Sequence, residues 1–515
     1  RDMAVRAIRA VGLDVGGVDF LTTDITESYK DVGGAIVEVN AAPGFRMHVA
    51  PSEGEPRDVA GKVMDMLFPP GTPTRIPVAS ITGTNGKTTT SRMLAHILKT
   101  AGHTVGMTST DGVYIDGRLS VKGDMSGPTS AHIVLRDPSV DVAVMETARG
   151  GLLRSGLGYR RCDVSACLNV AADHLGLKGI DTLEQLAELK RIVIEVARDT
   201  AVLNADDELC LKMADYTQAE HVCYVTMNPA HALVKEHIRA GGRAMVLEQG
   251  INGDMITLYD NGTHAQLVWT HQVPATMDGK ATHNVQNAMF AAALAYSMDK
   301  SLDDIRHGLR SFNSTIFQAP GRMNVFDEHP FRVILDYGHN AAAINSICQL
   351  VDRLEVSGRR ICVLAAPGDR RDEDIRAIAD EACGHFEHYI CRADDRRRGR
   401  GESEVPEMLR EQLLANGVDK AAIDLVPDEV MAVSGALEMA QEGDLVVLFA
   451  DDVRRSWNQV INFEGEHTGT GASEDTKSAT SFVEEDPDAF SLDPGTRLVR
   501  DERGVRLARE EEESD

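Results

Sequence analysis

The chain has 515 residues, of which 43% are hydrophobic, so it can bury the cores of about three domains at roughly 150 residues each. Its formal net charge of −27 argues against a nucleic-acid partner, because the phosphates would be repelled. No apolar run approaches the ~20 residues that span a bilayer, and no signal peptide is visible. We therefore expect no membrane contact and a cytoplasmic location.

Eight cysteines are scattered along the chain without a CxxC pair or a metal-ligand spacing. In an oxidising compartment or a zinc site, cysteines recur at short, regular spacings. The pattern here favours buried thiols in a reducing compartment.

The first 70 residues have the pattern of the end of a domain. Helical spacing, two pairing strands and an amphipathic helix are expected at 3–13, 16–25, 34–40 and 57–68. The stretch Pro-Pro-Gly-Thr-Pro at 69–73 predicts a stiff linker. We therefore place a domain boundary near residue 70.

The second of these strands ends in polar side chains. Glu38 and Asn40 alternate along it, so both point to one face, and Pro43-Gly44 then turns the chain away. A carboxylate and an amide oxygen at a strand end are suitable ligands for Mg²⁺ beside a nucleotide phosphate. The sequence therefore indicates a first nucleotide site here.

A complete-looking phosphate loop follows the linker, in the sequence GTNGKTT at 83–89. It lies between an apolar strand and a helix, so its glycines let backbone N–H groups surround a phosphate at the helix N-terminus. Lys87 can reach the β- and γ-phosphates, and the Thr88 hydroxyl can bind Mg²⁺. A chance glycine turn is the alternative, but the flanking strand and helix argue against it.

Beyond this loop, short β-rich runs alternate with helices, which is typical of α/β domains. Residues 221–280 are richer in strand and turn signals, a helix follows from Asn284, and a new α/β series opens at Pro320-Gly321. Residues 463–515 carry sixteen acidic and six basic residues, a net charge of −10, with few large apolar residues. We predict that this last segment is a disordered acidic tail.

The shortened loop GTNGKTT resembles that of the Mur ligases, ATP-dependent enzymes that join an amino acid to a carboxylate through an acyl-phosphate. The resemblance covers residues 75–460. It implies an α/β fold with a P-loop central domain at 71–320 and a Rossmann-like C-terminal domain at 321–462. It also implies that ATP and Mg²⁺ are bound through Gly83, Thr84, Asn85, Gly86, Lys87, Thr88 and Thr89.

The same resemblance implies metal ligands further along the chain. Glu146 ends the strand DVAVME, where the family has a carboxylate on the first Mg²⁺. His174 in NVAADHLG matches the family's histidine ligand for a second Mg²⁺, and Lys190 matches a lysine that many members carry as a carbamate. The alternatives are structural, because a glutamate at a strand end is often a surface residue and a single histidine is often part of the core.

Three further matches lie in later motifs. Asn287 in HNVQN is expected near the adenine, while Arg322 in PGRMNV and Asp336 in DYGHN belong to the domain that closes over the nucleotide. Asn287 and Asp336 could instead be caps or turns. The family's usual proline after DYGHN is Ala341 here, which affects turn stiffness rather than ligands. The implied catalytic residues are Lys87, His174, Lys190 and Arg322.

Two features resemble one branch of enzymes. The stretch ETARGGLLRSGLG at 146–158 departs from the serine-rich stretch of the peptidoglycan members. The stretches GGVDF and VEVNAAPGF resemble the end of an ATP-grasp domain, in which Asp19, Glu38 and Asn40 would be metal ligands. Together they resemble the cyanophycin synthetases, which build a poly-aspartate backbone and attach arginine to its side chains.

This resemblance implies arginine and a poly-Asp or cyanophycin primer as partners, and a homo-oligomer. We expect residues 1–70 to be the C-terminal remnant of an ATP-grasp domain and the chain to be a fragment that adds arginine but not aspartate. The alternatives are another Mur-type ligase, of the folylpolyglutamate or peptidoglycan kind, and a non-catalytic nucleotide-binding scaffold. The intact set of Lys87, Thr88, Glu146, His174 and Lys190 argues against the scaffold.

A bound arginine needs acidic residues, because a buried cation must be paired. The loop GDRRDEDI offers Asp369, Asp372, Glu373 and Asp374 for this purpose. The alternative is that these residues only start a solvated helix.

Overall fold

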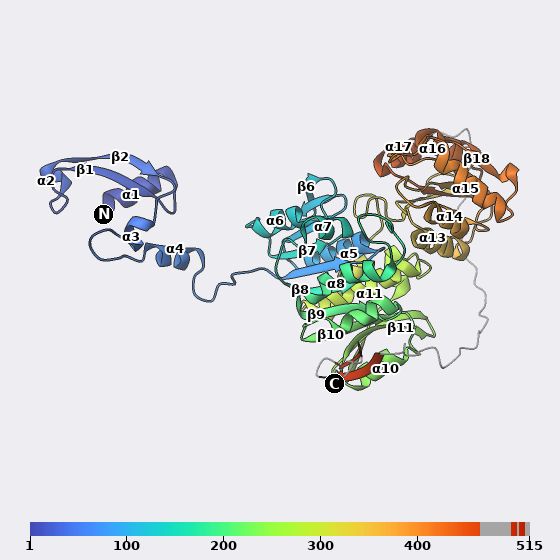
Figure 1. The fold of residues 1–515 in the computed structure, drawn as a ribbon, viewed down its shortest axis with the longest axis horizontal. Helices are drawn as coiled ribbons and strands as arrows, with labels where there is room; N and C mark the ends of the chain where they lie inside the picture. The colour runs from blue at the N-terminus through green and yellow to red at the C-terminus, as the bar shows by residue number, and fades with distance from the viewer. Residues whose placement is uncertain (464–495, 502–503, 510–515) are drawn as a thin grey trace. The chain divides into compact units, whose positions relative to one another are not determined.

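The structure is a computed structural model that describes residues 1–463, 496–501 and 504–509 (Figure 1). It divides into two compact units, Arg1–Ile76 and Pro77–Asp515, so the first unit extends a few residues beyond the predicted boundary at residue 70. Within the described ranges, every helix falls short of the length and apolarity that a membrane crossing requires. All eight cysteines are free thiols, and all but Cys383 are buried.

The first unit contains the predicted helix, strand pair and second helix. The helix α1 (Asp2–Val11) ends where Gly12 adopts φ +83°, and the strands β1 (Gly17–Thr22) and β2 (Gly34–Asn40) pair antiparallel. Two short helices, α2 (Tyr29–Val32) and α3 (Arg46–Val49), precede α4 (Val59–Leu67). None of the four helices has a fully buried residue, so this unit has no dense core of its own.

The second unit is built on an eleven-stranded sheet in the order β13-β12-β11-β10-β9-β8-β3-β7-β4-β5-β6. The strands are β3 (Val78–Thr82), β4 (Val105–Ser109), β5 (Gly112–Ile115), β6 (Arg118–Lys122), β7 (Val142–Glu146), β8 (Cys162–Cys167), β9 (Ala197–Asn204), β10 (His221–Thr226), β11 (Arg243–Gly250), β12 (Gly253–Asp260) and β13 (Thr263–Trp269). The seven central strands are parallel, and antiparallel hairpins extend both edges.

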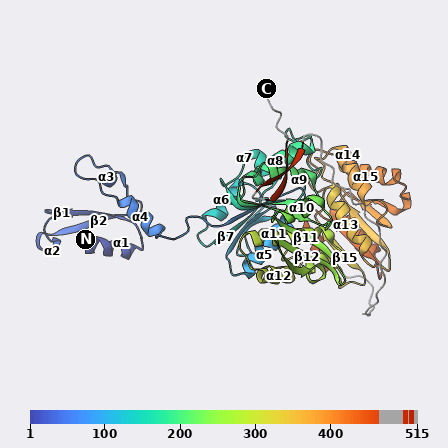
Figure 2. The ribbon, with the colours of Figure 1, turned by 90° about the horizontal axis from the view of Figure 1, so that it is seen from below.

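Helices cover both faces of this sheet, as a parallel sheet requires (Figure 2). One face carries α5 (Lys87–Thr100), α11 (Thr282–Ser297) and α12 (Leu302–Ser311), and the other carries α6 (Pro128–Arg136), α7 (Arg149–Ser155) and α8 (Leu183–Glu195). The short α9 (Glu208–Leu211) and α10 (Ala232–Arg239) lie further along the chain. The neighbours β7, β3 and β8 end side by side, so the loops after them share one edge of the sheet, where ligands bind in such folds.

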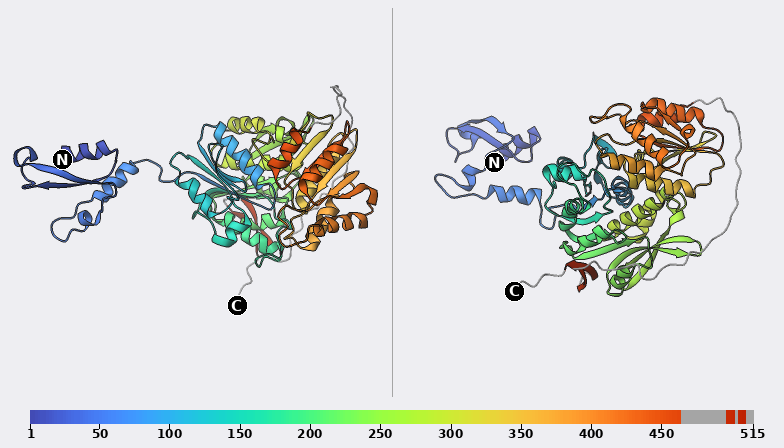
Figure 3. Two further views of the ribbon diagram at one scale, coloured as in Figure 1. Left: turned by 90° about the horizontal axis from the view of Figure 1, so that it is seen from above. Right: turned by 45° about the vertical axis from the view of Figure 1, so that its right-hand side comes forward.

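The C-terminal domain, orange in Figure 3, has a sheet of its own. Its strand order is β14-β15-β19-β16-β17-β18. Its strands are β14 (Asn324–Phe326), β15 (Arg332–Asp336), β16 (Arg360–Leu364), β17 (His388–Cys391), β18 (Ile423–Leu425) and β19 (Leu445–Phe449), all parallel except β14. The helices are α13 (Ala341–Arg353), α14 (Asp372–Ala382), α15 (Glu404–Ala415), α16 (Glu429–Met439) and α17 (Val453–Ile461). Two apolar clusters pack on its strands, which confirms the predicted Rossmann-like architecture.

The predicted disordered tail contains a described hairpin. Strands β20 (Thr496–Asp501) and β21 (Gly504–Arg509) pair antiparallel, and β21 lies beside α10 and the 3₁₀ turn Lys212–Asp215. The prediction of disorder is wrong for these residues, because it averaged composition over the whole segment and missed the alternation in TRLVRD and GVRLAR. The rest of the predicted tail, residues 464–495, 502–503 and 510–515, lies outside the described residues.

Candidate active site

The predicted phosphate loop joins β3 to α5. Gly83 has φ +151° and Gly86 has φ +84°, conformations that favour glycine. A Cβ on Gly86 would lie 2.3 Å from the Asn287 side-chain oxygen, and one on Gly83 would lie 2.9 Å from the Leu168 Cβ. The loop is therefore seated directly on the end of β8 and on α11, with no room for larger residues.

Three side chains hold this loop in place. The Asn169 side-chain oxygen accepts hydrogen bonds from the backbone N–H groups of Thr84 at 3.1 Å and Asn85 at 2.9 Å. The Lys190 Nζ donates to the Gly83 carbonyl at 2.8 Å. The partly buried Lys87 folds back over the loop and donates to the carbonyls of Gly83 at 2.9 Å and Thr84 at 2.7 Å. Sequence reasoning missed Asn169, although a polar residue just after a buried strand is a usable signal.

Beside the loop lies a buried carboxylate, Glu146, which is 2% exposed. The Thr88 hydroxyl donates to it at 3.1 Å, and Arg322 of the C-terminal domain donates to that hydroxyl at 3.3 Å. Burial raises the pKa of Glu146, although the charges of Lys87 and Arg322 oppose the rise. A hydroxyl and a carboxylate oxygen in contact are the hard ligands that Mg²⁺ prefers, so this pair fits the ion implied by the sequence.

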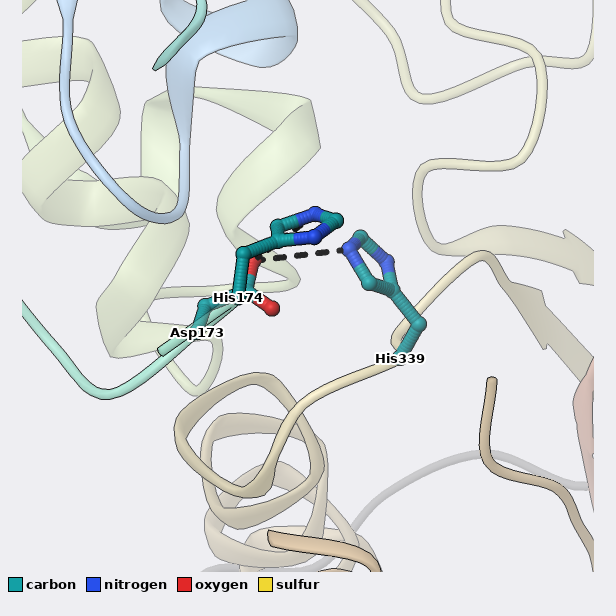
Figure 4. Close-up of side chains that lie close together, drawn as sticks. All are labelled: Asp173, His174 and His339. Atoms are coloured by element: carbon teal, nitrogen blue, oxygen red, sulfur yellow. Dashed lines mark ion pairs between the residues drawn. The ribbon is translucent and has the colours of Figure 1, made fainter. Parts of the chain in front are cut away.

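A second cluster spans the two domains of this unit. Asp173 and His174 follow β8, His339 follows β15, and their ligand atoms lie within 4.8 Å of one another. Figure 4 shows the His339 ring directed at the Asp173 carboxylate, 3.7 Å away. Arg370 of the C-terminal domain donates to Asp173 at 3.0 Å and to the Nε2 of His174 at 3.0 Å. Sequence reasoning identified only His174 as a site residue in this cluster.

The charges of this cluster follow from its contacts. Burial would raise the pKa of Asp173, but the hydrogen bond and charge of His339 and the charges of His174 and Arg370 hold it well below its usual range. Burial lowers the pKa of His174 to about 4, and the charge of Arg370 contributes. A guanidinium only donates, so the Nε2 of His174 is unprotonated. Its lone pair is the one that a metal would use, and here it accepts from Arg370.

Lys190 is the predicted partner of His174 for a second metal. It is 3% exposed, and burial lowers its pKa to about 8, assisted by the nearby charge of Lys87. Among the described residues no direct contact joins Lys190 to His174, because Lys190 donates to Gly83 instead. An amine that is partly neutral near pH 8 has the reactivity that carbamate formation needs, and the carbamate stays a prediction.

Asn287 and Asp336 could also be caps or turns on sequence grounds; Asn287 is buried and Asp336 is half-buried. The Asn287 side-chain oxygen accepts from the Thr90 hydroxyl at 3.3 Å, so this side chain lies beneath the loop. The carboxylate of Asp336 accepts from the backbone N–H groups of Met323 at 2.8 Å and Gly338 at 2.7 Å. Asp336 thereby fixes the turn that carries Arg322, which is the structural alternative left open by the sequence.

The C-terminal domain also contacts the phosphate loop through an amide pair. The side chains of Asn85 and Asn340 exchange hydrogen bonds of 3.1 and 2.9 Å. Together with the Arg322–Thr88 and Arg370–Asp173 contacts, this pair brings the C-terminal domain directly against the site.

The acidic loop GDRRDEDI has its carboxylates paired within the chain. Asp369 accepts from Arg370 and Arg398, at 2.7 and 2.6 Å. The other three form ion pairs with Arg400 and Arg371, and they occupy the first turn of α14; they are Asp372, Glu373 and Asp374. These pairs favour the interpretation as a helix start over a site for substrate arginine.

In the first unit the three predicted metal ligands share one face of the β1–β2 pair. Asp19 and Glu38 are direct cross-strand partners, and Asn40 lies opposite Gly17. Asp19 and Glu38 are exposed, and Asn40 is half-buried. Their role as ligands stays a prediction.

Comparison with known families decides the assignment. The family "Mur ligase middle domain" matches residues 81–295, and "Mur ligase, glutamate ligase domain" matches residues 321–451. Together the two matches cover more than half of the chain. The chain belongs to the Mur ligase family.

Individual relatives narrow the comparison within this family. The chain is 46% identical over 456 residues to the cyanophycin synthetase of Trichormus variabilis, which covers 88% of this chain and 50% of the relative. It is 44% identical over 453 residues to that of Synechocystis sp., covering 88% and 51%. The chain thus spans about half the length of these curated relatives. The predicted resemblance to cyanophycin synthetases is confirmed.

A solved structure supports the fold. The folylpolyglutamate synthase of Mycobacterium tuberculosis complexed with ADP superposes with a TM-score of 0.57 at 18% identity, over 78% of this chain and 94% of that chain. This likeness confirms the predicted Mur-ligase fold.

Proposed function

We propose that the chain is an ATP-dependent amino-acid ligase that joins arginine to the β-carboxylate of aspartate residues in a poly-Asp primer. The observation that carries this proposal is the buried Thr88–Glu146 pair at the phosphate loop, contacted by Arg322 from the neighbouring domain. It occurs in a chain 46% identical to a cyanophycin synthetase.

The loop at 83–89 would hold the phosphates of ATP through its backbone N–H groups. Thr88 and Glu146 would hold Mg²⁺, which when bound neutralises phosphate charge. Lys87 and Arg322 stabilise the γ-phosphoryl group while an oxygen of the aspartate carboxylate attacks its phosphorus and ADP leaves. The α-amino group of arginine then attacks the acyl carbon of the aspartyl phosphate, phosphate leaves, and the amine loses a proton.

The acyl-phosphate has to be protected from water. The C-terminal domain contacts the loop through Asn340 and Arg322. In the proposed mechanism this domain covers the phosphate site. A closed cleft excludes water and keeps the intermediate for the amine.

A second Mg²⁺ would be held by the neutral imidazole of His174 and by Lys190 as a carbamate. The unprotonated Nε2 of His174 fits a metal ligand, and Arg370 has to leave it for the ion to bind.

Residues 1–70 are proposed to be the last part of an ATP-grasp domain. Asp19 and Glu38 are exposed, and ions on exposed carboxylates keep most of their water and bind weakly. We therefore expect one ATP per chain, at Lys87, and no extension of the primer by aspartate. A homo-oligomer stays a prediction.

The direct test is ADP release by the full chain with ATP, Mg²⁺, a poly-Asp primer and one amino acid at a time. Arginine should be required, and Lys87→Ala should abolish the release. Release driven by glutamate or diaminopimelate would favour another Mur-type ligase. Nucleotide binding without any release would favour the scaffold.

A further inference from the structure

The stretch ETARGGLLRSGLG at 146–158 has no role in the mechanism so far beyond its first residue, Glu146. Three residues later, Arg149 begins the short helix α7. This helix is fixed against the neighbouring backbone, because a Cβ on Gly151 would lie 2.7 Å from the Gly127 Cα. Close packing of α7 therefore fixes the backbone of Arg149, three residues after the proposed metal ligand Glu146.

The guanidinium of Arg149 is only partly satisfied. Its Nη2 donates to the carbonyl of Leu177, in the loop that begins with Asp173 and His174. Its Nε is buried and has no hydrogen-bond partner among the described residues. Burial lowers the pKa of Arg149, and the charge of Asp173 opposes this effect. Arg149 as a whole is half-buried, and its charge together with its buried, unpaired Nε–H favours an anion as partner.

Three arginines of the C-terminal domain, unlike Arg149, each form an ion pair with a carboxylate. Arg370 is 3.0 Å from Asp173, Arg371 is 2.8 Å from Asp374, and Arg398 is 2.6 Å from Asp369. Arg149, by contrast, has no carboxylate within ion-pair distance in the part of the chain that the structure describes. An anion that pairs with Arg149 would therefore come from outside these residues.

The placement of the cations points the same way. In the described part of the chain, five cations lie around the loop ends: Lys87, Lys190, Arg149, Arg322 and Arg370. Lys87 and Arg322 gather at the phosphate loop, whereas Arg149 lies against the 173–177 loop. The phosphates of ATP would therefore not account for Arg149.

We propose that Arg149 binds a substrate carboxylate beside the phosphoryl-transfer site. This proposal rests on the proposed function, which supplies two sources of that chemistry: a side chain of the acidic polymer and the α-carboxylate of the incoming arginine. Arg149 would use its planar pair of donors to fix the carboxylate in one orientation.

The test compares the full chain with Arg149→Ala, Arg149→Lys and a matched control, Arg154→Ala. Arg154 lies on the same helix, is exposed, and donates to the Gly150 carbonyl. One arm measures the Kd of a fluorescein-labelled oligo-aspartate peptide by anisotropy, with an oligo-asparagine peptide as the uncharged control. A second arm measures the KM for arginine in ADP release. Calorimetry with a non-hydrolysable ATP analogue reports whether the nucleotide site is intact.

Arg149→Ala should weaken either the peptide Kd or the arginine KM by about tenfold to a hundredfold, the loss expected for a charge-assisted hydrogen bond. Arg149→Lys should recover part of that loss, and Arg154→Ala should stay within about twofold of wild type, as for an ordinary surface change. A weaker peptide Kd would identify the polymer side chain as the source of the carboxylate, and a higher arginine KM would identify the α-carboxylate of arginine. Affinity for the ATP analogue should not change.

Three results would overturn the proposal: both arms unchanged in Arg149→Ala, an equal loss in Arg154→Ala, or a parallel loss of ATP-analogue affinity that shows a structural role. A separate result would show that the proposed function itself is wrong: the wild-type chain would release no ADP in response to arginine. In that case the peptide arm alone decides, and an unchanged peptide Kd overturns the carboxylate site.

Discussion

Replacing Lys190 by methionine should stabilise the protein while abolishing its activity. Lys190 is 3% exposed, and burial lowers its pKa from 10.5 to about 8. That difference corresponds to about 3 kcal/mol by which the folded state disfavours the charged amine below pH 8. Methionine has a similar length and no charge, and the Gly83 carbonyl keeps its bond from Lys87 at 2.9 Å. We expect the free energy of unfolding to rise by about 1 to 3 kcal/mol at pH 7.5.

The gain should depend on pH with a defined sign. Because the folded pKa of Lys190 lies below the unfolded value, the unfolded chain binds more protons between about pH 8 and 10.5. The wild-type protein therefore gains stability relative to the variant as the pH rises through that range. The difference between the two proteins should narrow by about 2 kcal/mol between pH 7.5 and 9.5.

Tryptophan fluorescence can assign the measurement to one domain. The chain has two tryptophans, Trp269 in β13 of the central sheet and Trp457 in α17 of the C-terminal domain. In a Trp457→Phe background, urea unfolding followed at Trp269 reports the domain that contains Lys190. The buffer is free of bicarbonate, so the lysine carries no carbamate.

A variant that is less stable than wild type at pH 7.5, or a difference that does not change with pH, would refute this reasoning. Bicarbonate added at constant pH should stabilise only the wild-type protein if Lys190 forms a carbamate.

Three further changes have defined outcomes. Lys87→Ala should reduce arginine-dependent ADP release by ~10²-fold or more, and retention of a tenth of wild-type turnover would contradict the phosphate-loop assignment. Gly86→Ala should lower ATP-analogue affinity at least about tenfold, because the left-handed conformation costs about 1–2 kcal/mol and the methyl displaces Asn287. Gly102→Ala is its control, because Gly102 has φ +93° and a Cβ there would meet open space. This variant should lower the stability of the protein but not its affinity for the ATP analogue. Asp173→Asn should cost about 3–5 kcal/mol of unfolding free energy at pH 7, measured by urea titration. That difference should shrink as the pH falls below ~3.9, because a lowered carboxyl pKa contributes stability only above the unfolded value, and a pH-independent cost would count against it.

Local signals predicted one half of the site. The loop at 83–89 was predicted because its glycines lie between a buried strand and a helix. Glu146 was predicted through the resemblance to the Mur ligases, and it ends the neighbouring strand. The loop and Glu146 each follow or end a parallel strand. Because the carboxyl ends of parallel strands meet at one edge of a sheet, their proximity follows from their positions in the sequence.

The other half depends on tertiary contacts with no local signal. Arg370 reaches Asp173 and His174 across nearly two hundred positions of sequence, and nothing around it distinguishes it from the adjacent arginine. The acidic loop was misleading for the same reason, because the arginines that pair with it, such as Arg398, lie far along the chain. Such pairings follow from the packing of two domains and are set by the fold rather than by a motif.

The proposed activity is the attachment of arginine to aspartate side chains. The most direct measurement is the intact mass of a synthetic oligo-aspartate primer after incubation with the full chain, ATP, Mg²⁺ and an equal mixture of arginine, aspartate and glutamate. The proposed function predicts a ladder of added arginine residues, with one ADP released for each and with fragmentation placing every arginine on a β-carboxylate. An unchanged primer despite ADP release, or a ladder spaced by aspartate or glutamate, would contradict it.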